Sequence, residues 1–209
     1  MLLLSLACIV VLHVLRSDLD VVSDRLSEYA NGQYGSLMAT AFFAVGGAMA
    51  CLGAAMIMTG AASGWWRLDP AALAIGGLGM VISGLYQTDP TGSGTQEDVH
   101  SLASGCASLA LIGAAVAWSV VGPGRHVVPA RLLALVALTL GAVSPGLHHS
   151  AWTGLSQRLL WATLLGWLIV TTVELRSAPS LSYYKAIKLP SRGQLASRPL
   201  AWRRSAGHL

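Results

Sequence analysis

Six apolar segments, separated by short polar connections, constrain this chain more than any other feature of its sequence. A helix that crosses a lipid bilayer needs about 20 mostly apolar residues, within a range of about 17–25. All six segments come close to that length, although the first is short. They run over residues 1–15, 36–60, 71–88, 100–121, 128–146 and 158–175. The sequence therefore predicts an all-α fold, a polytopic six-helix transmembrane bundle.

The composition favours the same fold class and excludes several others. Charged residues make up 11% of the chain, against about 25% in soluble domains. This low value excludes a soluble enzyme domain, a disordered chain and an ordinary nucleic-acid-binding protein, so we expect no nucleic-acid partner. Three cysteines, Cys8, Cys51 and Cys106, lie in apolar runs without CxxC or Cys/His spacing. They indicate neither a disulfide framework nor a zinc finger.

The distribution of Lys and Arg predicts the orientation of the bundle. With six spans, both termini share one side with the second–third and fourth–fifth connections, and that side holds ten of the 13 basic residues. Seven of the ten are Arg176 and the six basic residues of a Pro-containing tail, residues 177–209, which follows the transmembrane domain 1–176. Because Lys and Arg accumulate in cytoplasmic loops, we expect cytoplasmic termini and a multi-pass protein of the bacterial inner membrane.

The first connection on the opposite, outer side is long and carries apolar residues at helical spacing. Leu19, Val22 and Leu26 would share one face of a short helix within residues 16–35. We expect that helix to rest on the membrane surface with its apolar face toward the lipid.

Polar residues gather at the outer ends of the predicted helices. Ionisable groups at membrane depth are costly and tend to face the bundle interior or a water-filled cavity. The sequence therefore predicts an outward-opening polar pocket between helix ends. Its candidate residues are Tyr29, Tyr34, Asp89, His100, His148, His149 and Arg158.

A structural interpretation of these residues centres on Asp89 and Arg158. If Asp89 accepts hydrogen bonds from His100 or Arg158, it ties three helix ends together. Arg158 opens the sixth apolar segment, and a helix N-terminus is the unfavourable end for a cation. We therefore expect an anionic partner for Arg158, either Asp89 or a lipid phosphate held by two hydrogen bonds.

A catalytic interpretation uses the same imidazoles and carboxylate. Asp89, His100 and either His148 or His149 would supply the three protein ligands of a catalytic zinc, which would make the chain a metal-assisted membrane hydrolase or a lipid-modifying enzyme. No HxxxH or HExxH spacing supports that alternative. A haem between His13 and another histidine has less support, because a lone histidine in an apolar helix usually bonds a neighbouring group. We expect no metal, no cofactor and no catalytic residue.

Short motifs in a fixed order give the chain a family resemblance. They are Ser27-Glu28-Tyr29 with Tyr34-Gly35, Thr88-Asp89-Pro90 with His100, and Gly154 with Gln157-Arg158 and Trp161. In this order they resemble the DUF998 family of prokaryotic six-helix membrane proteins, over residues 1 to about 175. The resemblance implies an integral membrane protein whose function is not established. Family members often carry an acidic residue where Gln157 stands, so this chain departs from the family there, and we expect no ion pair from that position to Arg158.

These observations predict a non-catalytic integral membrane protein. We expect either an accessory or scaffolding subunit of an inner-membrane complex or a lipid-binding protein, with membrane lipids and other membrane subunits as partners. Small residues spaced by four, such as Gly46, Ala50 and Ala54, favour close packing between helices. The basic tail suits an anionic inner leaflet, where each Lys or Arg contributes about 1 kcal/mol.

Overall fold

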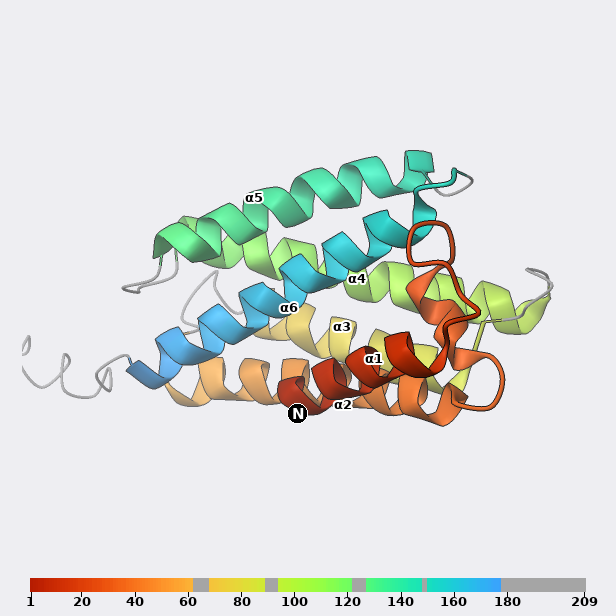
Figure 1. Cartoon of the computed structure of the whole chain (residues 1–209). Helices are drawn as coiled ribbons and strands as arrows, with labels where there is room; N and C mark the ends of the chain where they lie inside the picture. The colour runs from red at the N-terminus through yellow and green to blue at the C-terminus, as the bar shows by residue number, and fades with distance from the viewer. Residues whose placement is uncertain (62–67, 89–93, 122–126, 148–149, 178–209) are drawn as a thin grey trace, which may run out of the picture. The chain divides into compact units, whose positions relative to one another are not determined.

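The computed structural model describes residues 1–61, 68–88, 94–121, 127–147 and 150–177. Within these ranges every regular element is a helix (Figure 1). Its α-helices are α1 (Leu2–Leu15), α2 (Gly35–Met58), α3 (Leu68–Leu85), α4 (Thr95–Val121), α5 (Val127–Val143) and α6 (Thr153–Ser177). Two short 3-10 helices accompany them, η1 (Leu26–Ala30) and η3 (Ser144–Leu147). The described helices all belong to one unit, Met1–Ser177.

Five of the described helices, α2 to α6, are long and apolar enough to cross a membrane. The chain is therefore a multi-span membrane protein. Helix α1 is apolar but has 14 residues, fewer than the about 17 that a span requires. Helices α4 and α6 are longer than the apolar segments predict. They begin at Thr95 and Thr153, five residues before the predicted starts, because their first turns are polar. In α4 those polar residues include Glu97 and Asp98, and acidic side chains stabilise a helix N-terminus.

Helices that follow one another in the sequence pack against one another, and α6 also contacts α2 and α4. Backbones approach most closely where glycines face a neighbouring helix. A Cβ atom on Gly46 of α2 would lie 2.7 Å from the carbonyl oxygen of Gly77 in α3, and one on Gly79 would lie 2.7 Å from that of Ala103 in α4. Small residues drive helix packing where lipid replaces water. Gly46 therefore packs as its spacing predicts, whereas Ala50 and Ala54 are exposed.

The first connection does not form the expected surface helix, and that prediction is wrong. Residues 17–24 form turns and bends, and η1 begins only at Leu26, whose side chain is buried in the core. The carboxylate of Asp20 accepts hydrogen bonds from the backbone N–H groups of Val22 and Ser23, at 2.7 and 2.9 Å. Short polar side chains that bond nearby amides in this way compete with helix formation.

Candidate functional site

Four of the predicted polar residues are described by the structure, and they lie at the end of the bundle where α2, α4 and α6 begin, called the η1 end below. Tyr29 of η1 is buried, and Tyr34, the residue before α2, is half-buried against the core. His100 lies on α4 and Arg158 on α6. Asp89, His148 and His149 lie outside the described residues. The structure brings Tyr29 and Arg158 together, and it places His100 on a separate pocket.

Arg158 contacts uncharged groups from three parts of the chain. Its Nε donates a hydrogen bond to Nε2 of His13 on α1 at 3.2 Å, and its Nη1 donates to the backbone carbonyl oxygen of Asp24 at 2.6 Å. The guanidinium carbon lies 5.4 Å from the centre of the Tyr29 ring, within cation–π range. Arg158 therefore links α1, the first connection and α6. In the described ranges, no carboxylate forms an ion pair with it.

His13 is the acceptor in this cluster because its other ring nitrogen is already engaged. Nδ1 lies 2.8 Å from the carbonyl oxygen of Ile9, and a carbonyl can only accept a hydrogen bond. Nδ1 must therefore carry the hydrogen, which leaves the Nε2 lone pair for Arg158. The contact with Ile9 is the bond to a neighbouring backbone group that the sequence predicts for His13. The His13 and Tyr29 rings pack 4.9 Å apart, centre to centre.

The first turn of α6 docks the first connection by backbone contacts. The N–H of Leu155 donates to the carbonyl of Val22 at 2.9 Å, and Oε1 of Gln157 accepts from the N–H of Leu26 at 3.1 Å. A Cβ atom on Gly154 would overlap the Asp24 carbonyl group, whose carbon would lie 2.9 Å away. Glycine is therefore required at 154 for the connection to approach α6 this closely.

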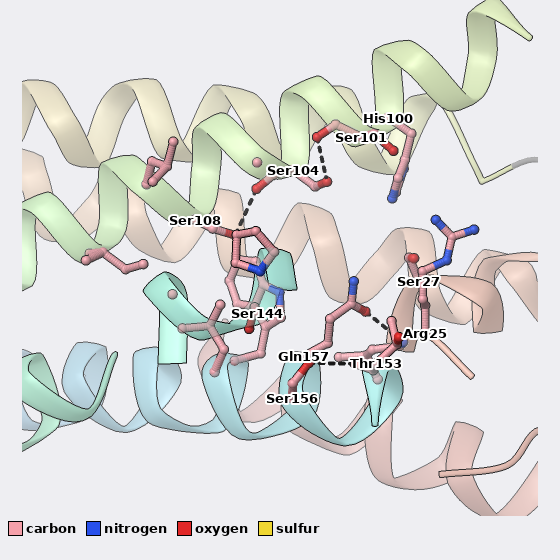
Figure 2. Close-up of a pocket in the computed structure, with 18 of the residues that line it drawn as sticks. Arg25, Ser27, His100, Ser101, Ser104, Ser108, Ser144, Thr153, Ser156 and Gln157 are labelled. Atoms are coloured by element: carbon pink, nitrogen blue, oxygen red, sulfur yellow. Dashed lines mark hydrogen bonds between the residues drawn. The ribbon is translucent and has the colours of Figure 1, made fainter. Parts of the chain in front are cut away.

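A cavity of about 360 Å³ lies beside this cluster, between α4, the first turns of α6, η1 and the end of α5 (Figure 2). We call it the serine pocket because hydroxyl groups supply most of its polar lining. Those hydroxyls belong to Ser27, Ser101, Ser104, Ser108, Ser144, Thr153 and Ser156. The three α4 serines are spaced by three and four residues, which places them on one face of the helix.

An ion-pair network forms the rim of the serine pocket. Arg25 donates to the carboxylates of Glu28 and Glu97, each at 2.9 Å, and Glu97 also accepts from the hydroxyl of Ser101 at 3.1 Å. Burial opposes the charged form of Arg25, but these hydrogen bonds outweigh it and raise the pKa of the guanidinium above its ordinary value. Arg25 therefore stays cationic and ties η1 to the first turn of α4.

His100 contributes one ring nitrogen to the pocket. Its side chain is 2% exposed, and Nδ1 lies 2.7 Å from the carbonyl oxygen of Tyr86 and 3.1 Å from that of Ser83. Both partners are acceptors, so Nδ1 carries the hydrogen. Nε2 has no hydrogen-bond partner among the described residues. Figure 2 shows the ring reaching from α4 toward the cavity.

Polarity changes along the serine pocket in the same direction on both of its long walls. On α4, His100, Ser101 and Ser104 precede Leu109 and Ile112. On α6, the lining runs from Thr153, Ser156 and Gln157 to Leu160 and Trp161. Both helices begin at the η1 end, so the cavity is polar there and apolar deeper in the bundle.

Sequence reasoning missed the ion-pair rim and the acceptor for Arg158. The spacing of Ser101, Ser104 and Ser108 carries a readable signal of a polar helix face. The Asp24 carbonyl carries none, because every residue has a backbone carbonyl. Among the described residues, no group of three His, Cys, Asp or Glu side chains is placed to hold a metal ion.

Comparison with known proteins places the whole membrane region in one family. A family model described as a protein of unknown function, DUF998, matches residues 2–174. No curated protein and no solved structure matches the chain.

Proposed function

The chain belongs to the DUF998 family, and we propose that it is a non-catalytic membrane protein that holds an amphiphile, such as a membrane lipid, in the serine pocket. The observation that carries this proposal is the parallel change from polar to apolar lining on α4 and α6. From His100 to Ile112 the lining extends about 18 Å along α4, at 1.5 Å per residue. A headgroup at the η1 end and acyl chains against Leu109, Ile112 and Trp161 match that order.

Two further properties support binding of a lipid from the bilayer. The cavity volume falls within the range of typical ligand pockets, about 300–1,000 Å³. Several lining residues, Ser101, Gly105, Leu109 and Pro145, are exposed, so the pocket opens sideways on the surface of a membrane-spanning helix. A lipid would enter through that opening without crossing the bundle.

Binding is favoured over catalysis by the state of the hydroxyl groups. A serine nucleophile needs a base that accepts its proton. Ser104 and Ser108 donate to backbone carbonyl oxygens of their own helix, and Ser101 donates to Glu97, which Arg25 already holds. The accessory-subunit role predicted from the sequence depends on the small-residue helix faces and the basic tail, whereas the geometry of the pocket favours the lipid-binding role.

Filling the pocket tests the proposal. Gly105 and Gly113 both lie on α4 with open space where a Cβ would be, but only Gly105 lines the pocket. We expect the wild-type chain and Gly113→Trp to retain about one lipid per chain in native mass spectrometry from mild detergent, as one pocket requires. Gly105→Trp should lose that lipid while keeping the same unfolding temperature as Gly113→Trp.

Other outcomes would contradict lipid binding or support one of the alternative functions. Equal lipid retention by all three proteins would contradict binding in the serine pocket. Zinc bound in a fixed ratio to the chain, and lost in His100→Ala, would support the metal-assisted hydrolase instead. Co-purifying membrane proteins that leave when residues 178–209 are deleted would support the accessory-subunit role.

A further inference from the structure

The serine pocket presents mainly hydrogen-bond acceptors. A hydroxyl group has one hydrogen to donate and two lone pairs that accept. Five lining hydroxyls already donate that hydrogen to the protein, and their partners are carbonyl or carboxylate oxygens. They are Ser101, Ser104, Ser108, Thr153 and Ser156. The lone pairs of these hydroxyls therefore remain for a ligand, as does Nε2 of His100, which has no protein partner among the described residues.

Four lining side chains have hydrogens with no acceptor among the described residues: Ser27, Ser144, Gln157 and Trp161. Gln157 uses its Oε1 to accept from Leu26, so its Nε2 amide hydrogens are free to donate. The hydroxyl of Ser144 is buried and has no partner among the described residues. A ligand that satisfies this lining must donate several hydrogen bonds and accept a few.

The charge at the rim disfavours an anionic ligand. Arg25 is the only Lys or Arg side chain among the described residues that line the pocket, and it is paired with two carboxylates. Those three groups sum to one negative charge, so a phosphate placed beside Arg25 would also face Glu28 and Glu97. Like charges at such short range repel strongly in a partly buried site.

From this accounting we infer that the serine pocket selects a neutral headgroup that carries several hydroxyl groups, such as a sugar or another polyol. This inference rests on the proposed function. A hydroxyl both donates and accepts, so a polyol can satisfy the serines and His100 as well as Gln157. A phosphate diester lacks donors, and an ammonium group lacks acceptors.

The headgroup preference can be measured by competition. The full chain in mild detergent is mixed with equal amounts of four lipids that share the same acyl chains, and the bound lipid is identified by native mass spectrometry. The probes are monoglucosyl diacylglycerol, phosphatidylglycerol, phosphatidylethanolamine and phosphatidylcholine. We expect the glucosyl lipid to bind about tenfold more tightly, the effect of one or two net hydrogen bonds.

Removing the acceptors provides the second measurement. The hydroxyls of Ser104 and Ser108 donate only within α4, so a Ser104→Ala/Ser108→Ala variant detaches no other element. It should lose about tenfold in affinity for the glucosyl lipid and keep its affinity for phosphatidylcholine. Thr163→Val is the matched control, because Thr163 makes the same kind of bond to Leu159 on α6 and does not line the pocket.

The outcomes separate this inference from the proposed function. Tighter binding of phosphatidylglycerol or phosphatidylethanolamine, still blocked by Gly105→Trp, would overturn the headgroup class and leave lipid binding intact. A serine variant that binds the glucosyl lipid as wild type does would also overturn it. If Gly105→Trp changes the binding of no lipid, the proposed function fails and the inference fails with it.

Discussion

Gly154→Ala should break the contacts that hold the first connection against α6. The added Cβ would overlap the Asp24 carbonyl group and lie 2.7 Å from Nη1 of Arg158. Neither neighbour can move independently, because Nη1 of Arg158 donates to Asp24 and the N–H of Leu155 donates to Val22. One methyl group therefore forces the connection away from the helix.

The magnitude follows from the contacts that this displacement breaks. A neutral backbone hydrogen bond contributes about 1 kcal/mol, and one with a charged donor contributes about 2 kcal/mol. Loss of the Leu155–Val22 and Arg158–Asp24 bonds should lower the free energy of unfolding by about 3 kcal/mol. For a chain of this size, that loss lowers the unfolding temperature by about 6–12 °C.

Thermal unfolding in detergent, followed by circular dichroism, measures the effect against a control on the same helix. A Cβ on Gly166 would meet only Leu133 side-chain atoms at 3.7 and 3.8 Å, an ordinary contact. Gly166→Ala should therefore be neutral or gain up to about 1 kcal/mol of helix propensity. The reasoning is refuted if Gly154→Ala unfolds within 2 °C of wild type, or if Gly166→Ala is equally destabilised.

Three further predictions concern polar contacts at the η1 end. His13→Leu removes the acceptor for Nε of Arg158 and should lower the free energy of unfolding by about 1–3 kcal/mol, measured by thermal unfolding in detergent. Arg25→Gln removes the cation that pairs with Glu28 and Glu97; we expect a loss of about 1–3 kcal/mol in the same assay, and a loss below 0.5 kcal/mol would contradict an energetic role for the rim. The N–H groups of Ser23 and Val22 hold the pKa of Asp20 below its ordinary 3.8, so this turn gains stability above that pH and loses it as the pH falls through the lower, folded-state pKa. Hydrogen-exchange protection of the Val22 and Ser23 amides should therefore fall on acidification, and Asp20→Asn should show a smaller pH dependence.

The helical part of the fold was predictable because its signal is physical and local. A long apolar run has few stable forms other than a membrane helix, so α2 to α6 were found from hydropathy alone. The polar first turns of α4 and α6 were missed because hydropathy detects only the apolar part of a helix. The turns around Asp20 were missed because apolar spacing is blind to a carboxylate that bonds nearby amides.

The site was predictable only in part. The placement of His100 and Arg158 at one end of the bundle follows from the lengths of the predicted spans. Their partners do not follow, because His100 and Arg158 bond backbone carbonyls of Tyr86 and Asp24, which have no side-chain signature. The contact between Arg158 and His13 joins residues 145 positions apart. Whether Arg158 and His13 reach the same depth in the bundle depends on how the first connection folds.

The cluster around Arg158 and the serine pocket, both at the η1 end, have different roles in the chain. Arg158, Tyr29 and Gly154 hold the first connection against α6, and that connection carries Arg25 to Glu97 at the rim of the serine pocket. Several of the motif residues that carry the family resemblance therefore belong to the scaffold, whereas Ser27, His100, Gln157 and Trp161 also line the pocket. A chain that shares the scaffold motifs but differs at the α4 serines should keep the docked connection and bind a different headgroup. Ligand preference within such a scaffold then varies with the α4 serines, which the motifs do not include.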